Sequence, residues 1–269
     1  MSGNNEVPGR TVVMKAAMIL EAFAGNRLAL SLSDLARATG LPCSTVHRLA
    51  GELVTWGGLE RTETGGYAVG IRLWEIAARS RRSYGLREAA MPFLQGLFDL
   101  TRQHVQLAVM DGADALLIEK ISAAQAVQTI GRVGGRLPLH ATAVGKALLA
   151  WSPADVQSRL ITRPLASYTP FTMTSESALR RELEETRRRG FAYSAQEMSL
   201  GAVSCAAPVL GPEPGAVAAV SVVMPAGEVS PLKWSQAVMA AAFGISRAYA
   251  QHRPQRAISA PLTGRAVSH

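Results

Sequence analysis

The fold of the first part of this chain is decided by residues 31–70, SLSDLARATGLPCSTVHRLAGELVTWGGLERTETGGYAVG. Ser31 and Asp34 have the Ser-x-x-Asp spacing with which two side chains satisfy backbone N–H groups in the first turn of a helix. Gly40 ends this helix. A turn and a second helix follow, and residues 59–69 alternate around a pair of glycines, which predicts a β-hairpin. Helix, turn, helix and hairpin in this order predict a winged helix-turn-helix.

The second helix, which ends at Trp56, has an apolar and a polar face. The predicted buried stripe consists of Val46, Leu49, Ala50, Leu53 and Val54, which recur at helical spacing. The polar residues of the first turn and a half are Ser44, Thr45, His47 and Arg48. Recognition helices present their N-terminal residues to the major groove, and hydroxyls and arginine suit phosphates and guanine edges. These side chains are predicted to contact double-stranded DNA, and Arg61 of the hairpin is predicted to contact the DNA backbone. The alternative is a helical hairpin that does not bind DNA.

Charge agrees with this prediction without establishing it. The formal net charge of +8 favours a polyanion as partner. Residues 1–82 contain ten Lys and Arg against seven Asp and Glu, a balance of +3, and the rest of the chain contains eighteen against thirteen, a balance of +5. A generally basic protein explains this distribution equally well.

No catalytic residue, metal site or cofactor is predicted. Cys43 and Cys205 are far apart and indicate neither a disulfide framework nor metal spacing. His104 and His140 lie in separate segments, and the sequence points to no partner for Cys205. No apolar run approaches the ~20 residues of a membrane span, and residues 1–10 lack the apolar core of a signal peptide. We therefore expect a cytoplasmic protein without a membrane partner.

The chain is expected to form two domains. The expected segments are a disordered N-terminus (1–10), the winged helix-turn-helix (11–70), a linker helix (71–85), a second domain (86–252) and a disordered tail (253–269). An apolar stripe from Val12 to Phe23 supplies a third helix for the small domain. In the linker, Trp74 and Ala77 form an apolar edge that suits a dimer contact, and Gly85 separates the linker from the next helix.

The second domain mixes strands and helices. Strands are predicted at 105–110, 116–121, about 127–130, 202–209 and 216–223, and helices at 86–101, 143–151, from 152 onward, 175–189 and 234–249. The glycine-rich loop before Ala143 lacks the Gly-x-x-x-x-Gly-Lys-Ser/Thr spacing of a phosphate loop, which argues against a nucleotide site. A helix N-terminus with small residues is nevertheless a good place for a carboxylate.

Three separated blocks of sequence resemble the IclR-type bacterial transcription regulators. They are LPCSTVHRL at 41–49, LPLHATAVGKALLA at 137–150, and GFAYS at 190–194 leading to Glu197 and to CAAPV at 205–209. The resemblance extends from about Thr11 to Tyr249. It implies an α+β protein with an N-terminal winged helix-turn-helix, a linker helix and a C-terminal GAF-like effector-binding domain, whose mixed or antiparallel sheet is flanked by helices. It also implies homodimers, often paired into homotetramers, on operators near catabolic or stress genes. Because a single winged helix makes too few base contacts for operator-level affinity, we expect a symmetric pair on a palindromic operator.

The resemblance further implies an effector pocket. Its lining would be Thr129, Leu137, Ala143, Val144, Gly145, Val203, Cys205, Ser221 and Val223, with backbone N–H groups at 143–145 receiving a carboxylate. Relatives that bind small keto acids tend to have an acidic residue and a second serine where this chain has Ala195 and Val223. Because a more apolar pocket orients a small polar acid less strongly, we expect an aromatic or otherwise partly apolar acid. The alternatives are packing roles: Cys205 as a small hydrophobe and Ser221 as a hydroxyl satisfied within its sheet.

These features together predict a ligand-responsive regulator that represses or activates a catabolic operon. Its partners are expected to be palindromic operator DNA, a small-molecule effector and further copies of the chain. An effector that binds one arrangement of a dimer better shifts the population that can bind DNA, which gives both domains a role. The alternatives are a DNA-binding protein without an effector and a cysteine-dependent enzyme.

Overall fold

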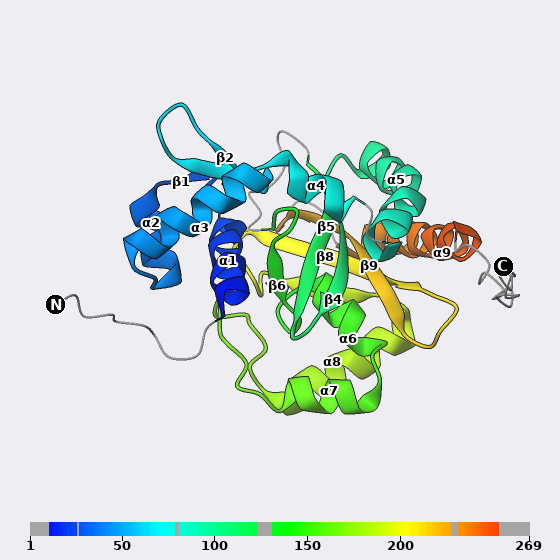
Figure 1. The fold of residues 1–269 in the computed structure, drawn as a ribbon. Coiled ribbons are helices and arrows are strands. Elements are labelled where there is room, and N and C mark those ends of the chain that lie inside the picture. The colour runs from blue at the N-terminus through cyan, green and yellow to red at the C-terminus, as the bar shows by residue number, and fades with distance from the viewer. Residues whose placement is uncertain (1–10, 26, 79–80, 123–130, 228–230, 253–269) are drawn as a thin grey trace, which may run out of the picture. The chain divides into compact units, whose positions relative to one another are not determined.

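The computed structural model describes residues 11–25, 27–78, 81–122, 131–227 and 231–252 (Figure 1). The chain divides into two compact units, Met1–Tyr84 and Gly85–His269. The two termini predicted to be disordered, 1–10 and 253–269, and the strand expected near 127–130 lie outside the described residues.

The first unit is a winged helix-turn-helix, as predicted from the sequence. Its elements are α1 (Val12–Glu21), the 3-10 helix η1 (Ala22–Ala24), β1 (Ala29–Leu30), α2 (Leu32–Thr39), α3 (Cys43–Trp56), β2 (Leu59–Arg61), β3 (Tyr67–Val69) and α4 (Ile71–Ala77). The hairpin β2–β3 forms the wing, and β1 pairs with the other edge of β3. The sequence did not predict β1, because two residues are too few to show the alternation of a strand.

Capping and left-handed glycines set the ends of α2 and α3. Ser31 Oγ accepts a hydrogen bond from the Asp34 N–H (3.1 Å), and the Asp34 carboxylate accepts one from the Ser31 N–H (3.2 Å). Hydrogen bonds from the Ser31 hydroxyl and N–H also lower the pKa of Asp34. α2 ends at Gly40 (φ +67°) and α3 at Gly57 (φ +85°), a conformation that glycine adopts without steric cost.

The apolar stripe of α3 packs into the core of the first unit only in part. Val46, Leu49 and Ala50 are buried, together with Ile19 of α1, Leu35 of α2 and Tyr67 of β3. Leu53 and Val54, predicted to belong to the same stripe, are half-buried and lie at the edge of this core.

The predicted linker helix is shorter in the structure. α4 ends at Ala77, and α5 (Arg81–Thr101) continues through Gly85, which we expected to separate two helices. That prediction is wrong because a glycine inside a helix costs only about 1 kcal/mol relative to alanine. The apolar face of α5 that becomes buried, and so compensates for this cost, contains Leu86, Ala90, Leu94 and Leu97.

The second unit is built on a six-stranded sheet. Its further elements are β4 (His104–Asp111), β5 (Asp114–Ile121), β6 (Arg136–Pro138), α6 (Ala143–Ala150), α7 (Ala154–Ile161), α8 (Glu176–Arg189), β7 (Ala192–Ala195), β8 (Ala202–Leu210), β9 (Ala216–Pro225), the 3-10 helix η2 (Pro231–Trp234) and α9 (Ser235–His252). The strand order is β6-β5-β4-β9-β8-β7, and every neighbouring pair is antiparallel. The short strands β6 and β7 were not predicted.

The two faces of this sheet belong to two hydrophobic cores. On one face, α5 and α9 pack against side chains such as Val105, Cys205 and Val222. On the other face, α6 and α8 pack against smaller side chains such as Ala206 and Ala219 (Figure 1). All residues of α6 are buried, so the N-terminal end of this helix lies inside the unit. No helix in the described part of the chain is long and apolar enough to cross a membrane.

Candidate functional site

The polar face of α3 is open on the surface of the first unit. Ser44, His47 and Arg48 are exposed, and Thr45 is half-buried. Arg48 Nη1 lies 2.7 Å from Glu52 Oε1, and both side chains are more than half exposed. Since an exposed pair contributes little to stability, Arg48 can exchange Glu52 for a phosphate or a guanine edge.

Arg61 of the wing is exposed and held by two contacts. Its guanidinium carbon lies 4.1 Å from the centroid of the Tyr67 ring, and Nη1 donates a hydrogen bond to Gly65 O (3.3 Å). Because Tyr67 is fully buried, Arg61 lies over a ring that is fixed in the core. A positive charge held on a wing in this way suits a DNA phosphate.

Two apolar surfaces of the first unit are exposed. One is a groove between α1 and α3, lined by Val12, Val13, Ala16, Ala17, Leu20, Leu49, Glu52, Leu53 and Trp56. The other is α4, on which Ile71, Trp74 and Ile76 are each more than half exposed. Ala77, predicted to share an edge with Trp74, is exposed as well. Contiguous exposed apolar surface of this kind is typical of contacts between proteins.

A cavity in the second unit lies between the N-terminal end of α6 and the sheet. Its lining consists of Gln106, Gly131, Leu137, Ala141, Thr142, Ala143, Val144, Ser194, Met198, Ser199, Ala202, Val203, Ser204, Ser221 and Val223. The cavity has a volume of about 50 Å³, below the roughly 300–1,000 Å³ of small-molecule sites, so a ligand of that size requires its walls to move apart.

Most of the pocket residues expected from the sequence meet in this cavity. Those that line it are Leu137, Ala143, Val144, Val203, Ser221 and Val223. Thr129 lies outside the described residues. Ala195 does not line the cavity, whereas Val223, the other position expected to differ from keto-acid-binding relatives, does.

Cys205 was predicted to line the pocket, and this prediction is wrong. It is fully buried in the core that α5 and α9 cover. Successive residues of β8 point to opposite faces, and it is the next residue, Ala206, that pairs with the cavity residue Ser221. Burial raises the pKa of the Cys205 thiol to about 12, so this side chain packs and is not a nucleophile. The described residues also contain no group of three or more His, Cys, Asp or Glu side chains that could hold a metal ion.

The prediction that the Gly145 N–H binds a carboxylate is also wrong. Its N–H already donates a hydrogen bond to Thr142 Oγ1 (3.2 Å), the cap of α6. A Cβ atom at Gly145 would lie 2.4 Å from the backbone of Leu139. The glycine therefore allows α6 to pack closely on the preceding segment.

The first turn of α6 nevertheless has two backbone N–H groups, in residues that line the cavity, without an acceptor in the helix. The N–H groups of Gly145 and Lys146 are bonded to Thr142. Those of Ala143 and Val144 are the first two in the helix and have no acceptor within it. Both residues line the cavity. Backbone donors at the positive end of a helix suit a carboxylate.

Among the hydroxyl groups that line the cavity, that of Ser221 is both buried and without a hydrogen-bond partner among the described residues. Thr142 Oγ1 donates to Pro138 O (2.8 Å), and Ser194 Oγ donates to Ala141 O (3.1 Å). Ser221 is 1% exposed, and its Oγ has no hydrogen-bond partner among the described residues. The alternative that its own sheet satisfies this hydroxyl therefore does not hold. A buried hydroxyl without a partner costs about 1–3 kcal/mol, so a ligand group that bonds to Ser221 would relieve part of this cost.

The sequence did not identify the remaining polar residues of the cavity. Gln106 of β4 pairs with Ser221, and Ser204 of β8 pairs with Val223. The paired side chains lie on the same face of the sheet only in the observed strand register. A shift of one strand by one residue would move all its side chains to the opposite face. The sequence alone does not give this register, so it did not identify Gln106 and Ser204 as cavity residues.

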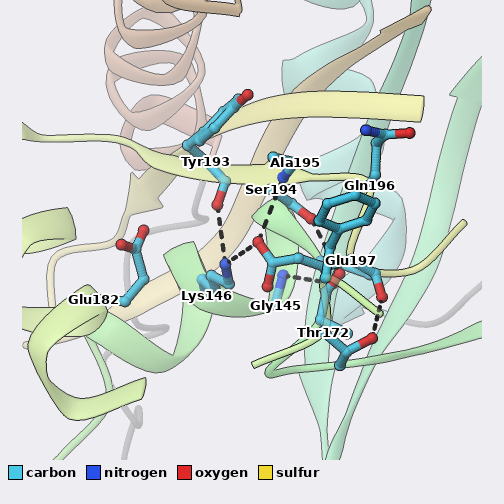
Figure 2. A network of polar contacts seen from close by, with 12 residues as sticks. Gly145, Lys146, Thr172, Glu182, Tyr193, Ser194, Ala195, Gln196 and Glu197 are labelled. Atoms are coloured by element: carbon cyan, nitrogen blue, oxygen red, sulfur yellow. Dashed lines mark hydrogen bonds and ion pairs between the residues drawn. The ribbon is translucent and has the colours of Figure 1, made fainter. Parts of the chain in front are cut away.

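A buried ion pair adjoins the cavity. Figure 2 shows Lys146 of α6 pointing toward Glu197, in the segment between β7 and β8. Lys146 Nζ lies 2.6 Å from Glu197 Oε1 and donates to Tyr193 O (3.0 Å). The two side chains are 0% and 4% exposed. They are 51 positions apart, so no local spacing in the sequence predicts the pair.

Two segments of the chain match known families. Residues 79–247 match the family described as "Bacterial transcriptional regulator IclR C-terminal". Residues 12–63 match the one described as "IclR helix-turn-helix domain".

Individual relatives cover most of the chain. The HTH-type transcriptional regulator XynR of Escherichia coli (strain K12) is 34% identical over 211 residues, which is 78% of this chain and 84% of that protein. The transcriptional repressor IclR of the same organism is 30% identical over 216 residues, 79% of each chain. Among solved structures, an IclR homolog from Microbacterium hydrocarbonoxydans complexed with 4-hydroxybenzoate has a TM-score of 0.84 and 34% identity, covering 89% of this chain and 99% of that one.

Proposed function

This chain belongs to the IclR family of bacterial transcriptional regulators, and we propose that it regulates a catabolic operon in response to an aromatic acid. It is a DNA-binding regulator and not an enzyme, as its family membership indicates. In this proposal the winged helix-turn-helix contacts the operator through Ser44, Thr45, His47, Arg48 and Arg61. The effector occupies the cavity of the second unit. Such a role also places the protein in the cytoplasm, where bacterial DNA is.

The single observation that carries the effector proposal is the distribution of polar groups in the cavity. The N–H groups of Ala143 and Val144 can receive a carboxylate, and the unpartnered hydroxyl of Ser221 can bond to a second polar substituent. Leu137 and Val223 supply apolar wall. 4-Hydroxybenzoate, bound by the relative from Microbacterium hydrocarbonoxydans, has a carboxylate and a phenol on one apolar ring. The match between these two polar groups and those of the cavity supports an aromatic acid as the effector.

Small keto acids fit this cavity less well. Glyoxylate and pyruvate have almost no apolar area to place against the aliphatic wall, so they gain little from burial. The described residues that line the cavity include no charged side chain, and such a site orients a small polar acid weakly.

We further propose that the DNA-binding form is a symmetric dimer, or a tetramer made of two dimers, on a palindromic operator. One winged helix makes too few base contacts for operator-level affinity. The exposed apolar side chains of α4, Trp74 among them, and the groove between α1 and α3 offer surface for such a contact. An effector that binds one arrangement of the dimer better then changes the fraction that binds DNA.

A thermal-shift panel tests the effector class. The full chain is heated with 4-hydroxybenzoate, benzoate, glyoxylate or pyruvate at matched concentrations. The aromatic acids are expected to raise Tm in proportion to the logarithm of their concentration, because a ligand that binds the native state stabilises it. Stabilisation by the keto acids alone would contradict the proposal. No shift with any acid, in protein that still enriches specific DNA fragments, would favour a DNA-binding protein without an effector.

Sequencing of the DNA fragments that the purified protein enriches tests the DNA half of the proposal. We expect palindromic sites, and the genes beside them should encode the breakdown of an aromatic compound. Enrichment of unrelated sequences would contradict an operator-specific role.

A further inference from the structure

Glu197 joins several separate parts of the second unit. Its Oε1 accepts hydrogen bonds from Lys146 Nζ (2.6 Å) and from the Ala195 N–H (3.4 Å). Its carbonyl oxygen accepts hydrogen bonds from Thr172 Oγ1 (2.6 Å) and Thr169 Oγ1 (3.4 Å). Figure 2 shows the carboxylate directed toward α6 and the carbonyl directed toward Thr172. One residue therefore ties the end of β7 both to a helix and to a loop.

The turn that follows β7, residues 196–201, is held in a strained conformation. Gln196 has φ +56°, which is uncommon for a residue other than glycine. Its N–H donates to Ala202 O (2.9 Å), and its Oε1 accepts from the Gly201 N–H (2.9 Å). Such a conformation persists only where its surroundings enforce it. Met198 and Ser199 of this turn line the cavity, so the strained turn forms part of its wall.

The opposite end of the ion pair lies on the helix that forms another part of the wall. Lys146 follows the cavity residues Ala143 and Val144 in the same helix. The pair therefore connects the helix end that offers backbone donors with the turn that closes the cavity beside it.

The ion pair contributes less to stability than its short distance suggests. Both charges are removed from water, and the attraction between them must first offset that loss of hydration. Glu197 Oε2 is buried and has no hydrogen-bond partner among the described residues, so the network is only partly satisfied. Apolar side chains of similar volume often stabilise a protein equally well at such a place. Apolar side chains would not reproduce the ion pair that connects the 196–201 turn to α6.

We propose that Lys146 and Glu197 are positioning residues for the effector, whose ion pair fixes the 196–201 turn against α6 and so sets the shape of the cavity. This inference rests on the proposed function, because it assigns the pair a role in the effector site. It predicts that loss of the pair weakens ligand binding while the fold remains.

The test replaces both charges at once. In Lys146→Met/Glu197→Met neither partner is left as an isolated buried charge. The matched control is Glu176→Met/Arg180→Met, which removes an exposed ion pair in α8 (Arg180 Nη2 to Glu176 Oε1, 2.9 Å). Three quantities are compared with the wild type. They are Tm, the hydrogen exchange of backbone amides in residues 194–204 by mass spectrometry, and the affinity for 4-hydroxybenzoate by calorimetry.

We expect the double variant to fold with a Tm close to that of the wild type. Its amides at 194–204 should exchange about tenfold faster or more without ligand, because local opening becomes easier. Its affinity for 4-hydroxybenzoate should fall about tenfold, since the binding-competent shape is less populated. The α8 control should change none of the three quantities.

Unchanged exchange and affinity would overturn the proposal. A double variant that does not fold would also overturn it, because the pair would then be needed for folding itself. Glu197→Gln keeps the shape of the side chain but leaves the buried Lys146 without its counter-charge, so exchange at 194–204 should increase at least as much as in the double variant; wild-type exchange in Glu197→Gln would contradict the role of the charge. If the wild type itself does not bind 4-hydroxybenzoate, the proposed effector class fails, and the exchange data still decide the positioning role.

Discussion

Replacing Ser221 with alanine should stabilise the protein and weaken effector binding at the same time. Ser221 Oγ is buried and has no partner among the described residues. Leaving a buried hydroxyl unsatisfied costs about 1–3 kcal/mol. Ser221→Ala removes this cost and leaves a smaller side chain, so we expect a net stabilisation of about 1 kcal/mol. For a domain of this size that corresponds to a rise in Tm of roughly 2–4 °C.

Binding should change in the opposite direction. If the Ser221 hydroxyl bonds to the effector, its removal should cost about 0.5–1.5 kcal/mol, the net value of one neutral hydrogen bond. This corresponds to a loss of affinity of about 2- to 13-fold. The assay is calorimetric titration with 4-hydroxybenzoate, together with a melting curve of each variant without ligand.

Ser194→Ala is the matched control, because the hydroxyl of Ser194 lines the same cavity but already donates to Ala141 O. Its loss should lower stability by about 1 kcal/mol. A Ser221→Ala variant with a lower Tm and wild-type affinity would refute the reasoning, since its hydroxyl would then support the fold and not the ligand.

Three further substitutions, the last with a control variant, test other parts of the structure. Arg48→Ala should weaken specific operator binding by about 1–3 kcal/mol with an unchanged Tm; wild-type affinity in a gel-shift titration would remove Arg48 from the predicted DNA contacts. Trp74→Arg should lower the oligomeric mass measured by light scattering while the effector still binds, because α4 exposes this ring; an unchanged mass would place the dimer contact elsewhere. Gly145→Ala should destabilise the protein by about 1–3 kcal/mol, since the new Cβ meets the backbone of Leu139. Gly96→Ala, at an open position inside α5, should instead stabilise the protein by about 0.5–1 kcal/mol. Identical melting curves for the two alanine variants would show that the backbone around Leu139 shifts at no cost in stability.

The helix ends were predictable from the sequence because their chemistry is local. Ser31 and Asp34 cap α2 with hydrogen bonds three residues apart, and Gly40 and Gly190 end their helices in the left-handed conformation. Gly85 shows the limit of the same argument. Its residue type favours a break, but tertiary burial along α5 outweighs that preference.

The candidate site was less predictable because its geometry depends on strand register. The family resemblance placed Cys205 and Ser221 in one pocket, whereas the pairing of β8 with β9 puts them on opposite faces of the sheet. Lys146 and Glu197 are close only through the tertiary fold. Neither the register nor this contact leaves a periodic signal in the sequence.

The most direct test of the central claim is the effect of an aromatic acid on operator binding. A labelled operator fragment, taken from the enriched DNA, is titrated with the full chain while fluorescence anisotropy is measured, with and without saturating 4-hydroxybenzoate. We predict that the acid changes the apparent Kd about tenfold or more, a coupling free energy of about 1.4 kcal/mol, and that glyoxylate does not. Superimposable curves, under conditions in which calorimetry shows the acid bound, would contradict a ligand-responsive regulator.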